Sequence, residues 1–216
     1  MPVTEATKSL NICMKLRVTA KRVRREGVNL DGRDKMARIL AKRPYPPGVH
    51  GPNNRSRITD YGKQLREKQR AKLVYGIMER QFSNYFVKST KMKGDTGENL
   101  VRLLELRLDN VVFRAGLSKT RAGARQIVSH NHVNVNGKSV NIPSYKVKVG
   151  DVITIRENKR KKKTWINFSE TVTSVETPSW LTTDLKELTV KVTSLPAGEE
   201  LKQVFDPKLI IEFYSR

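Results

Sequence analysis

The chain has 216 residues, with 43 Lys or Arg against 21 Asp or Glu, and a formal net charge of +22 at pH 7. A chain this basic repels itself when it is compact, so we expect it to lie against a polyanion such as nucleic acid. No run of 18 apolar residues is present, which excludes a membrane-spanning helix. The single cysteine, Cys13, excludes an internal disulfide and a cysteine-only zinc site.

The positive charge belongs to the first part of the chain. Residues 1–160 hold 35 basic and 13 acidic side chains, whereas residues 161–216 hold eight of each. The first 30 residues are basic but lack the apolar core of a secretory signal, so we interpret them as mature chain. This distribution predicts a nucleic-acid-facing part within residues 1–160 and a more neutral end.

The predicted elements begin with an irregular, basic segment over residues 1–58. Residues 31–41 have the apolar spacing of a short helix. Residues 42–52 contain four prolines and two glycines, which rule out a helix or a central strand. The prolines stiffen this segment and leave Arg43 and His50 available to a partner, although a plain linker is the alternative interpretation.

Four helical patterns follow. The first begins at Thr59 or Asp60 and is interrupted at Gly76. The second continues to about residue 90 and carries aromatic residues at helical spacing, which we interpret as core rather than as base-stacking groups. The third is one helix from about residue 96 to Gly116, and the fourth begins after Thr120 and ends near His130.

Strand patterns occupy most of the remaining chain. Asn136-Gly137 is a strong signal for a two-residue hairpin turn between residues 132–135 and 138–142. Further strands are expected at 145–149, 152–155, 189–193 and 208–214, with a turn at 178–181 that holds a buried or docking tryptophan. The cationic tract Lys159–Lys163 is either an added RNA contact or a solvated loop.

The fold class that these elements predict is α+β, with an N-terminal helical domain and a mixed domain that holds two helices followed by a small antiparallel sheet. The expected divisions are a basic extension over 1–41, a helical domain over 42–95, a mixed domain over 96–195 with the two-helix and sheet module at about 105–156, and a C-terminal segment over 196–216 that returns to the helical domain.

The two-helix module suggests how the chain grips a phosphate. The helix that begins after Thr120 points backbone N–H groups outward. Arg121 and Arg125 are four residues apart and therefore share one face. Arginine offers a planar fork to phosphate and stacks on bases. The candidate phosphate-binding residues are Lys63, Arg66, Arg70, Arg107, Arg114, Lys119, Arg121 and Arg125. Further candidate RNA contacts are Arg43, Tyr45, His50, Arg55, Arg57, His130, Asn134 and Lys138.

Simpler interpretations compete with these roles. Any one arginine can form a surface salt bridge, and for Arg107 beside Asp109 this alternative is serious. For the eight phosphate candidates together, the excess of positive charge leaves too few carboxylates to pair them. His130 and His132 lie two residues apart without a nearby cysteine, which makes a poor metal site. We therefore expect no catalytic residue, no cofactor and no metal.

A family resemblance covers nearly the whole chain from about residue 42. Residues Arg107–Ile155 resemble a small RNA-binding domain found in small-subunit ribosomal protein four, some tyrosyl-tRNA synthetases, pseudouridine synthases and a heat-shock RNA-binding protein. The flanking segments resemble bacterial-type small-subunit ribosomal protein four. These segments are Arg43–Gly48, Tyr61–Gln69, Tyr75–Phe82, Gly97–Leu100, Val140–Tyr145 and Ile211–Arg216.

The resemblance implies a structural role on the ribosome. Such proteins bind a multi-helix junction of the small-subunit rRNA 5′ domain and nucleate assembly. They line the mRNA entry region, they contact small-subunit protein five in a way that affects decoding accuracy, and some repress their own messages. A bacterial-type ribosome in the cytoplasm is implied, with an organellar ribosome left open. Many members carry four N-terminal cysteines that hold a metal, and here only Cys13 is present.

Two other classes of protein remain as alternatives. The first is a fragment of an RNA-modifying or tRNA-charging enzyme that uses the same module. No Gly-rich phosphate loop or catalytic constellation supports it. The second is a non-specific basic DNA-binding protein, against which the hairpin module and the aromatic-rich helices argue.

Overall fold

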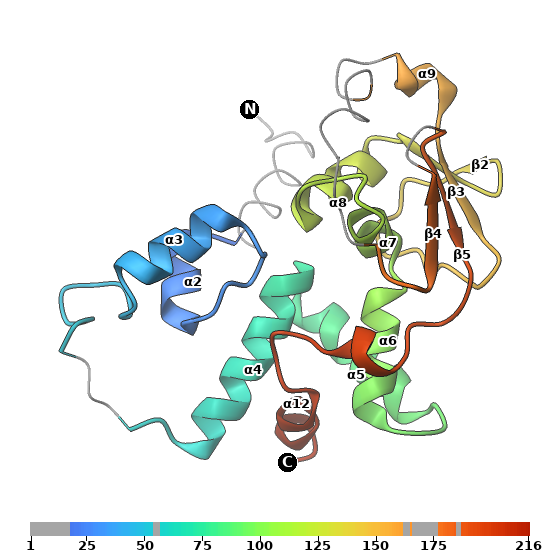
Figure 1. Cartoon of the computed structure of the whole chain (residues 1–216). Helices are drawn as coiled ribbons and strands as arrows, with labels where there is room; N and C mark the ends of the chain where they lie inside the picture. The colour runs from blue at the N-terminus through green and yellow to red at the C-terminus, as the bar shows by residue number, and fades with distance from the viewer. Residues whose placement is uncertain (1–17, 54–56, 162–164, 166–176, 185–186) are drawn as a thin grey trace, which may run out of the picture. The chain divides into compact units, whose positions relative to one another are not determined.

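The capping signals in the sequence mark real helix ends in the first part of the chain. The structure is a computed structural model that describes residues 18–53, 57–161, 165, 177–184 and 187–216 (Figure 1). The chain divides into two units. The helical unit comprises the described residues up to Gly97 together with Gln203–Arg216, and the sheet unit comprises those between Glu98 and Lys202.

Residues Ala20–Glu26 form helix α2, so the prediction of an irregular segment is wrong there. The ends of the helix after Thr59 follow the sequence signals. Thr59 Oγ1 accepts a hydrogen bond from the Gly62 backbone N–H at 3.2 Å, and Gly76 ends the same helix with φ +61°. The predicted helices after Thr59 and after Gly76 are confirmed. The helix predicted over 31–41 begins at Asp34. The helices are α2 (Ala20–Glu26), α3 (Asp34–Lys42), α4 (Asp60–Tyr75), α5 (Glu79–Thr90) and α12 (Pro207–Tyr214).

The strand predicted over residues 208–214 is wrong, because this segment forms helix α12. Its run of β-branched and aromatic residues is equally compatible with a strand or a buried helix turn. Two local signals favour the helix. Asp206 accepts a hydrogen bond from the Lys208 N–H at 2.9 Å, and Pro207 occupies the first turn.

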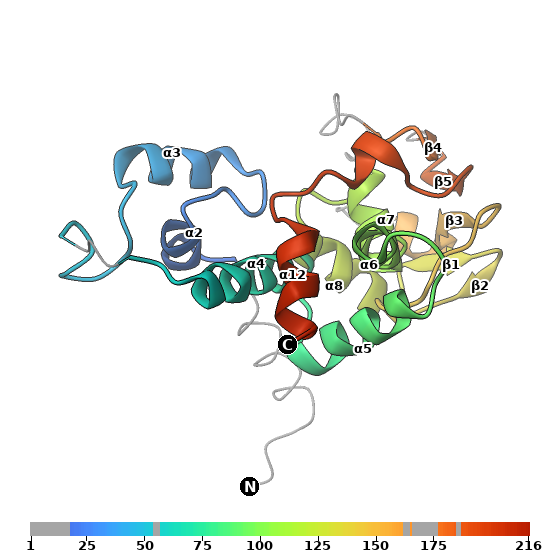
Figure 2. The same ribbon diagram turned by 90° about the horizontal axis from the view of Figure 1, so that it is seen from below.

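Helix α12 packs along α4, as Figures 1 and 2 show. The Tyr214 ring stacks on Phe86 with centroids 4.7 Å apart, and Phe213 lies 5.6 Å from Tyr61. Phe82 and Phe86 of α5 both contact the Tyr214 ring, which confirms their interpretation as core, whereas Tyr85 is only half-buried. Phe82 is fully buried among them.

One carboxylate ties α4, α5 and α12 together. Glu79 accepts hydrogen bonds from Lys68 Nζ at 2.9 Å, Lys72 Nζ at 2.6 Å and the Tyr214 hydroxyl at 2.7 Å. Partial burial raises the pKa of Glu79, but these bonds outweigh it and lower the pKa from 4.5 to about 2. Burial and the same carboxylate raise the pKa of Tyr214.

The sheet unit places a five-stranded antiparallel sheet beside two helices. The strand order is β2-β1-β3-β5-β4. Asn136 and Gly137 both have positive φ, 49° and 78°, so the predicted hairpin turn is confirmed. The elements are α6 (Thr96–Glu105), α7 (Leu108–Arg114), α8 (Arg121–Ser129), β1 (Val133–Val135), β2 (Lys138–Ser139), β3 (Val152–Ile155), α9 (Glu157–Arg160), β4 (Leu181–Asp184), β5 (Thr189–Val192) and the 3-10 turn η1 (Gly198–Leu201).

The single helix predicted from residue 96 to Gly116 is wrong, because it breaks into α6 and α7. At the break the chain pairs with residues 145–147 instead of continuing its own hydrogen bonds. Val147 N–H donates to the Leu106 carbonyl at 3.0 Å, and Leu108 N–H donates to the Tyr145 carbonyl at 2.9 Å. The segment predicted as a strand over 145–149 therefore contributes only an isolated bridge, between Lys146 and Arg107.

A single apolar core fixes α7 and α8 against the sheet. Val133 and Val135 on β1 lie opposite Ile155 and Ile153 on β3, and all four are buried. Trp180, which is 1% exposed, belongs to the same core, so the prediction of a buried tryptophan is confirmed. The turn predicted at 178–181 leads directly into strand β4, which the sequence did not predict. No helix in the described residues is long and apolar enough to cross a bilayer.

Glu79 gives the helical unit a pH-dependent component of stability. Because its folded pKa lies below the unfolded value, the stabilisation is complete above about pH 5 and is lost as pH falls toward 2. We predict that Glu79→Gln lowers the unfolding free energy by about 1 kcal/mol at pH 7, a figure reduced for the half-exposed carboxylate. The loss should shrink at pH 3. Urea unfolding followed by far-UV circular dichroism measures it.

The matched control is Asp60→Asn, which removes an exposed carboxylate that also pairs with a lysine, Lys63. Its effect should be small at both pH values, because water screens this exposed pair. A Glu79→Gln loss of equal size at pH 7 and pH 3 would contradict the assignment.

Candidate nucleic-acid interface

Four arginines of the sheet unit gather around the start of α7 and one side of α8. We call Arg107, Arg114, Arg121 and Arg125 the arginine cluster. Arg107 precedes α7 and Arg114 ends it, whereas Arg121 and Arg125 lie one turn apart on α8. The start of α8 follows the sequence signal, because Thr120 Oγ1 accepts a hydrogen bond from the Gly123 N–H at 3.1 Å.

Asp109 holds two members of the cluster. Arg107 Nε and Nη2 donate to its two carboxylate oxygens at 3.1 and 3.0 Å. Arg125 Nε and Nη2 both donate to Asp109 Oδ2, at 3.0 and 2.8 Å. The Asp109 side chain is 6% exposed, so this pairing takes place under the surface. Burial makes the pairing necessary, since an unpaired charge at this depth would be costly.

Glu105 holds the other two members. Arg114 Nε and Nη2 donate to its carboxylate at 3.0 and 3.1 Å. The Asn110 amide also donates to Glu105 Oε2 at 2.7 Å, and Asn110 Oδ1 accepts a hydrogen bond from Arg121 Nε at 2.8 Å. The Arg121 guanidinium lies 4.5 Å from the centre of the Phe113 ring, which fixes its plane.

The cluster keeps a surplus of positive charge at the surface. Its four arginines face two carboxylates, both nearly fully buried. Arg114 and Arg125 remain 29% and 24% exposed, and Arg121 is half-buried. The carboxylates therefore orient the guanidinium groups from below and leave cationic edges toward solvent. Such edges match the oxygens of a phosphate.

Arg107 differs from the other three. Its side chain is 3% exposed and is committed to Asp109. The expectation that Arg107 contacts phosphate directly is not supported by this burial. Its position instead assigns it to holding Asp109, which in turn orients Arg125.

The other candidates of the sheet unit lie apart from the cluster or at its margin. Lys119 is exposed just before α8, and His130 is exposed at its end. Lys138 is exposed on β2 after the hairpin turn. Asn134 alternates with the core residues of β1, so it points to the sheet face away from the core. Its Oδ1 is buried and has no hydrogen-bond partner among the described residues.

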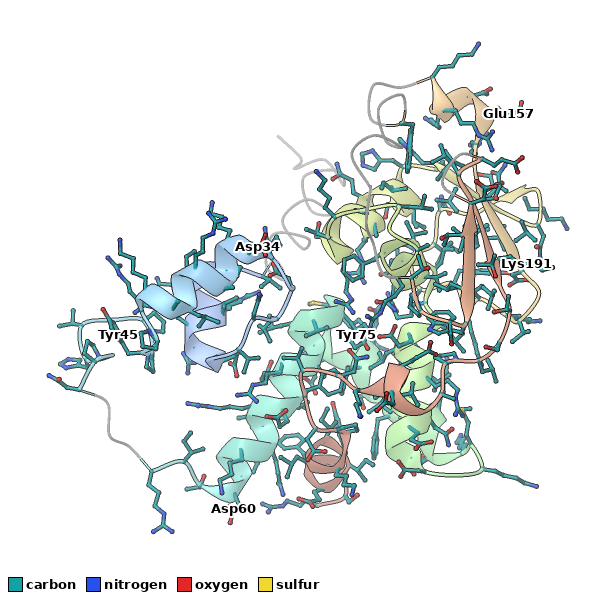
Figure 3. All side chains as sticks on the ribbon, in the orientation of Figure 1. Asp34, Tyr45, Asp60, Tyr75, Glu157 and Lys191 are labelled. Carbon is teal, nitrogen blue, oxygen red and sulfur yellow. The ribbon has the colours of Figure 1, made fainter. Side chains whose placement is uncertain are left out.

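The candidates of the helical unit fall into two groups. On α4, Lys63 pairs with Asp60 at 2.9 Å, Arg66 is half-buried, and Arg70 pairs with Glu67 and donates to the Glu26 carbonyl at 2.9 Å. In the segment after α3, Arg43, His50 and Arg57 are exposed, and Tyr45 is half-buried (Figure 3). Arg55 lies outside the described residues, as do Lys162 and Lys163 of the cationic tract.

The argument that carboxylates are too few to pair the phosphate candidates is wrong. Five of the eight form ion pairs, because the carboxylates that they need lie within a few residues or one helix away. These pairs are Lys63–Asp60, Arg70–Glu67, Arg107–Asp109, Arg114–Glu105 and Arg125–Asp109. Net charge counts all carboxylates, whereas pairing depends on which ones the fold brings near.

Sequence reasoning missed the residues that orient the candidates. Glu105 and Asn110 gave no pattern of their own, since their partners lie up to eleven residues away. Arg24 was also missed, although it holds the Pro-rich segment 21 residues further on. No group of three or more His, Cys, Asp or Glu side chains in the described ranges is placed to hold a metal ion.

The fold and its basic surface are of the kind found in RNA-binding proteins. Family models match two adjoining stretches: the ribosomal protein S4/S9 N-terminal domain over residues 16–105 and the S4 domain over residues 106–153. The chain therefore belongs to the ribosomal protein uS4 family, whose members are structural rRNA-binding proteins and not enzymes.

Curated relatives are similar to this chain over most of its length. A protein of Roseiflexus sp. (strain RS-1) named small ribosomal subunit protein uS4 is 48% identical over 196 residues, which cover 89% of this chain and 94% of the relative. A protein of the same name from Caldicellulosiruptor saccharolyticus is 50% identical and covers 82% of this chain and 85% of its own. Another from Borrelia hermsii is 44% identical, covering 91% and 95%.

The arginine cluster predicts an unusual sensitivity at Asp109. Removing this carboxylate takes the bidentate partner Asp109 from the buried Arg107, which should cost about 3–5 kcal/mol of unfolding free energy. We predict this loss for Asp109→Ala, measured by urea unfolding with tryptophan fluorescence, since both Trp165 and Trp180 are buried in this unit. Glu199→Ala, which breaks an exposed pair with Lys202, should change the midpoint little. Equal effects of the two variants would contradict the buried pairing.

Proposed function

We propose that this chain is a structural component of the small ribosomal subunit that docks a branched junction of its rRNA through oriented cations. The observation that carries the proposal is the arginine cluster, whose guanidinium groups are fixed by the buried Glu105 and Asp109. Membership of the uS4 family indicates that the bound RNA is small-subunit rRNA. The arginine cluster suggests how the protein holds the phosphates of this RNA.

The chemistry of the cluster suits folded RNA. A-form helices hide base edges in a deep groove, so junctions are recognised through phosphates, 2′-hydroxyls and shape. Arg114, Arg121 and Arg125 would contact phosphates, with Lys119 and the N-terminal end of α8 beside them. Because the carboxylates already fix the guanidinium planes, less side-chain freedom is lost when RNA binds. Arg43, Tyr45, His50, Arg57, Lys63 and Arg66 would contact RNA from the helical unit.

The finer assignments follow from the family resemblance. The docking site is a multi-helix junction in the 5′ domain of the rRNA, and binding there nucleates assembly. Small-subunit protein five and mRNA at the entry region are the further partners, and the interface with protein five contributes to decoding accuracy. The location is a bacterial-type ribosome in the cytoplasm. The net positive charge that this chain keeps fits early binding, before other proteins shield the phosphates.

A direct comparison of ligands tests the proposal. The chain should bind a transcript of the rRNA 5′ domain more tightly than duplex DNA of equal length at moderate salt, measured by filter binding. Equal affinity for the two would favour a non-specific basic protein and would overturn the ribosomal assignment.

The cluster itself is tested by the double variant Arg121→Ala, Arg125→Ala. It should weaken binding to the transcript and reduce the slope of log affinity against log salt by about 2, one for each lost phosphate contact. The variant Arg121→Lys, Arg125→Lys keeps the charges but loses the planar guanidinium groups and their paired donors. It should therefore bind the transcript more weakly and retain most of the slope of log affinity against log salt. An unchanged slope in the alanine variant, with Trp180 fluorescence still native, would show that this face does not contact RNA.

A further inference from the structure

The turn residue Asn136 is joined to the start of β3, which lies beside β1 in the sheet (Figure 2). The Asn136 backbone N–H donates to the Val152 carbonyl at 2.8 Å. In the other direction, the Val152 N–H donates to the side-chain Oδ1 of Asn136 at 2.9 Å. The side-chain amide of Asn136 therefore takes the place that its backbone carbonyl would hold in a regular antiparallel pair.

The nitrogen of the same amide is held by Asp151. Asn136 Nδ2 donates to Asp151 Oδ1 at 2.8 Å, and Asp151 Oδ2 accepts a hydrogen bond from the Lys148 N–H at 2.8 Å. Asp151 is 9% exposed, whereas Asn136 is exposed. Both polar atoms of the Asn136 amide are thus engaged. We call the two residues the Asn136–Asp151 pair.

The residue that follows Asn136 makes its amide chemically vulnerable. Asn136 is the only asparagine of the chain that precedes a glycine. Glycine has no side chain to shield its backbone nitrogen, and a Cβ built on Gly137 would meet no atom within 4 Å. The Gly137 nitrogen can therefore close a ring on the Asn136 side-chain carbonyl without steric hindrance. Asparagine is among the thermolabile side chains for this reason.

We propose that Asn136 is a deamidation site that the Asn136–Asp151 pair protects while the sheet unit is folded. In the reaction, the Gly137 nitrogen bonds to Asn136 Cγ and loses its proton, and Nδ2 departs with that proton as ammonia. Water then opens the cyclic imide at either carbonyl and leaves an aspartyl or an isoaspartyl residue. Turning Cγ toward Gly137 breaks both hydrogen bonds of the amide, so folding slows the reaction. The inference is independent of the proposed function, because it involves no RNA.

Deamidation also removes the contact that protects the residue. The aspartyl product has a carboxylate oxygen where Nδ2 lay, 2.8 Å from Asp151 Oδ1. Two carboxylates repel each other at this distance, and neither donates a hydrogen bond. The isoaspartyl product adds a methylene group to the backbone, which a two-residue turn does not accommodate. The modified turn therefore separates from β3, and the hairpin that carries Lys138 gains a negative charge.

The rate of deamidation is measured on the full chain by peptide mapping with mass spectrometry, at mildly alkaline pH. The chain unfolded in guanidinium chloride should react at Asn136 about tenfold faster than the folded chain. Asn141 is the internal control, because it is exposed and precedes the β-branched Ile142. Equal rates at Asn136 in the two states would overturn the protection. A rate at Asn136 no greater than that at Asn141 in the unfolded chain would overturn the site itself.

A variant of the partner residue tests whether the pair, rather than folding in general, gives the protection. Asp151→Ala removes the acceptor of the Asn136 amide, and it should speed deamidation in the folded chain several-fold. The matched control is Asp184→Ala, which removes an exposed carboxylate from β4 of the same unit. It should leave the rate unchanged. An unchanged rate in Asp151→Ala, or an equal increase in the two variants, would overturn the role of Asp151.

The consequence of the reaction is tested with Asn136→Asp, which imitates the aspartyl product. Hydrogen exchange of the Val152 N–H should become about tenfold faster in this variant. Adding Asp151→Asn exchanges the two groups, so that the amide at position 151 donates to the carboxylate at position 136. Exchange at Val152 should then return to within about twofold of the unaltered chain. Unaltered exchange in Asn136→Asp, or no recovery in the double variant, would show that repulsion between the two carboxylates does not open the turn.

Discussion

The pairing of surface arginines with buried carboxylates is the interaction on which the site depends. A surface that meets RNA needs net positive charge, yet a long side chain left unrestrained loses entropy on binding. Glu105 and Asp109 meet both needs, because they pair with Arg107, Arg114 and Arg125, and Glu105 also holds the Asn110 amide that orients Arg121. Burial gives the arrangement its rigidity and also its cost, since removing Asp109 takes the carboxylate from the buried Arg107.

The helical unit follows a related rule, in which one half-exposed carboxylate holds two lysines that are largely covered. Glu79 gathers Lys68, Lys72 and Tyr214, and thereby fixes a C-terminal helix to helices more than a hundred residues earlier in the chain. In both units, carboxylates lie where the geometry of cationic side chains is fixed.

Much of the fold could be predicted from local signals. Thr59 and Thr120 mark helix starts through their own hydroxyls, and Asn136-Gly137 fixes a hairpin through its positive φ values. The failed predictions have different causes. The break between α6 and α7 depends on the distant backbone of residues 145–147. The helix α12 was signalled locally by Asp206 and Pro207, but its apolar residues also suit a strand. Periodicity alone does not separate a short apolar strand from a helix turn.

The sequence by itself determined the polyanion-binding character, the α+β class and the arginines of α8, because charge, periodicity and capping are local properties. Only the tertiary structure decided which arginines reach solvent. Arg107 and Arg125 are equally basic in sequence, yet one is buried under Asp109 and the other opens to the surface. Solvent exposure depends on what packs around a side chain, and that neighbourhood exists only after residues far apart in the chain have come together.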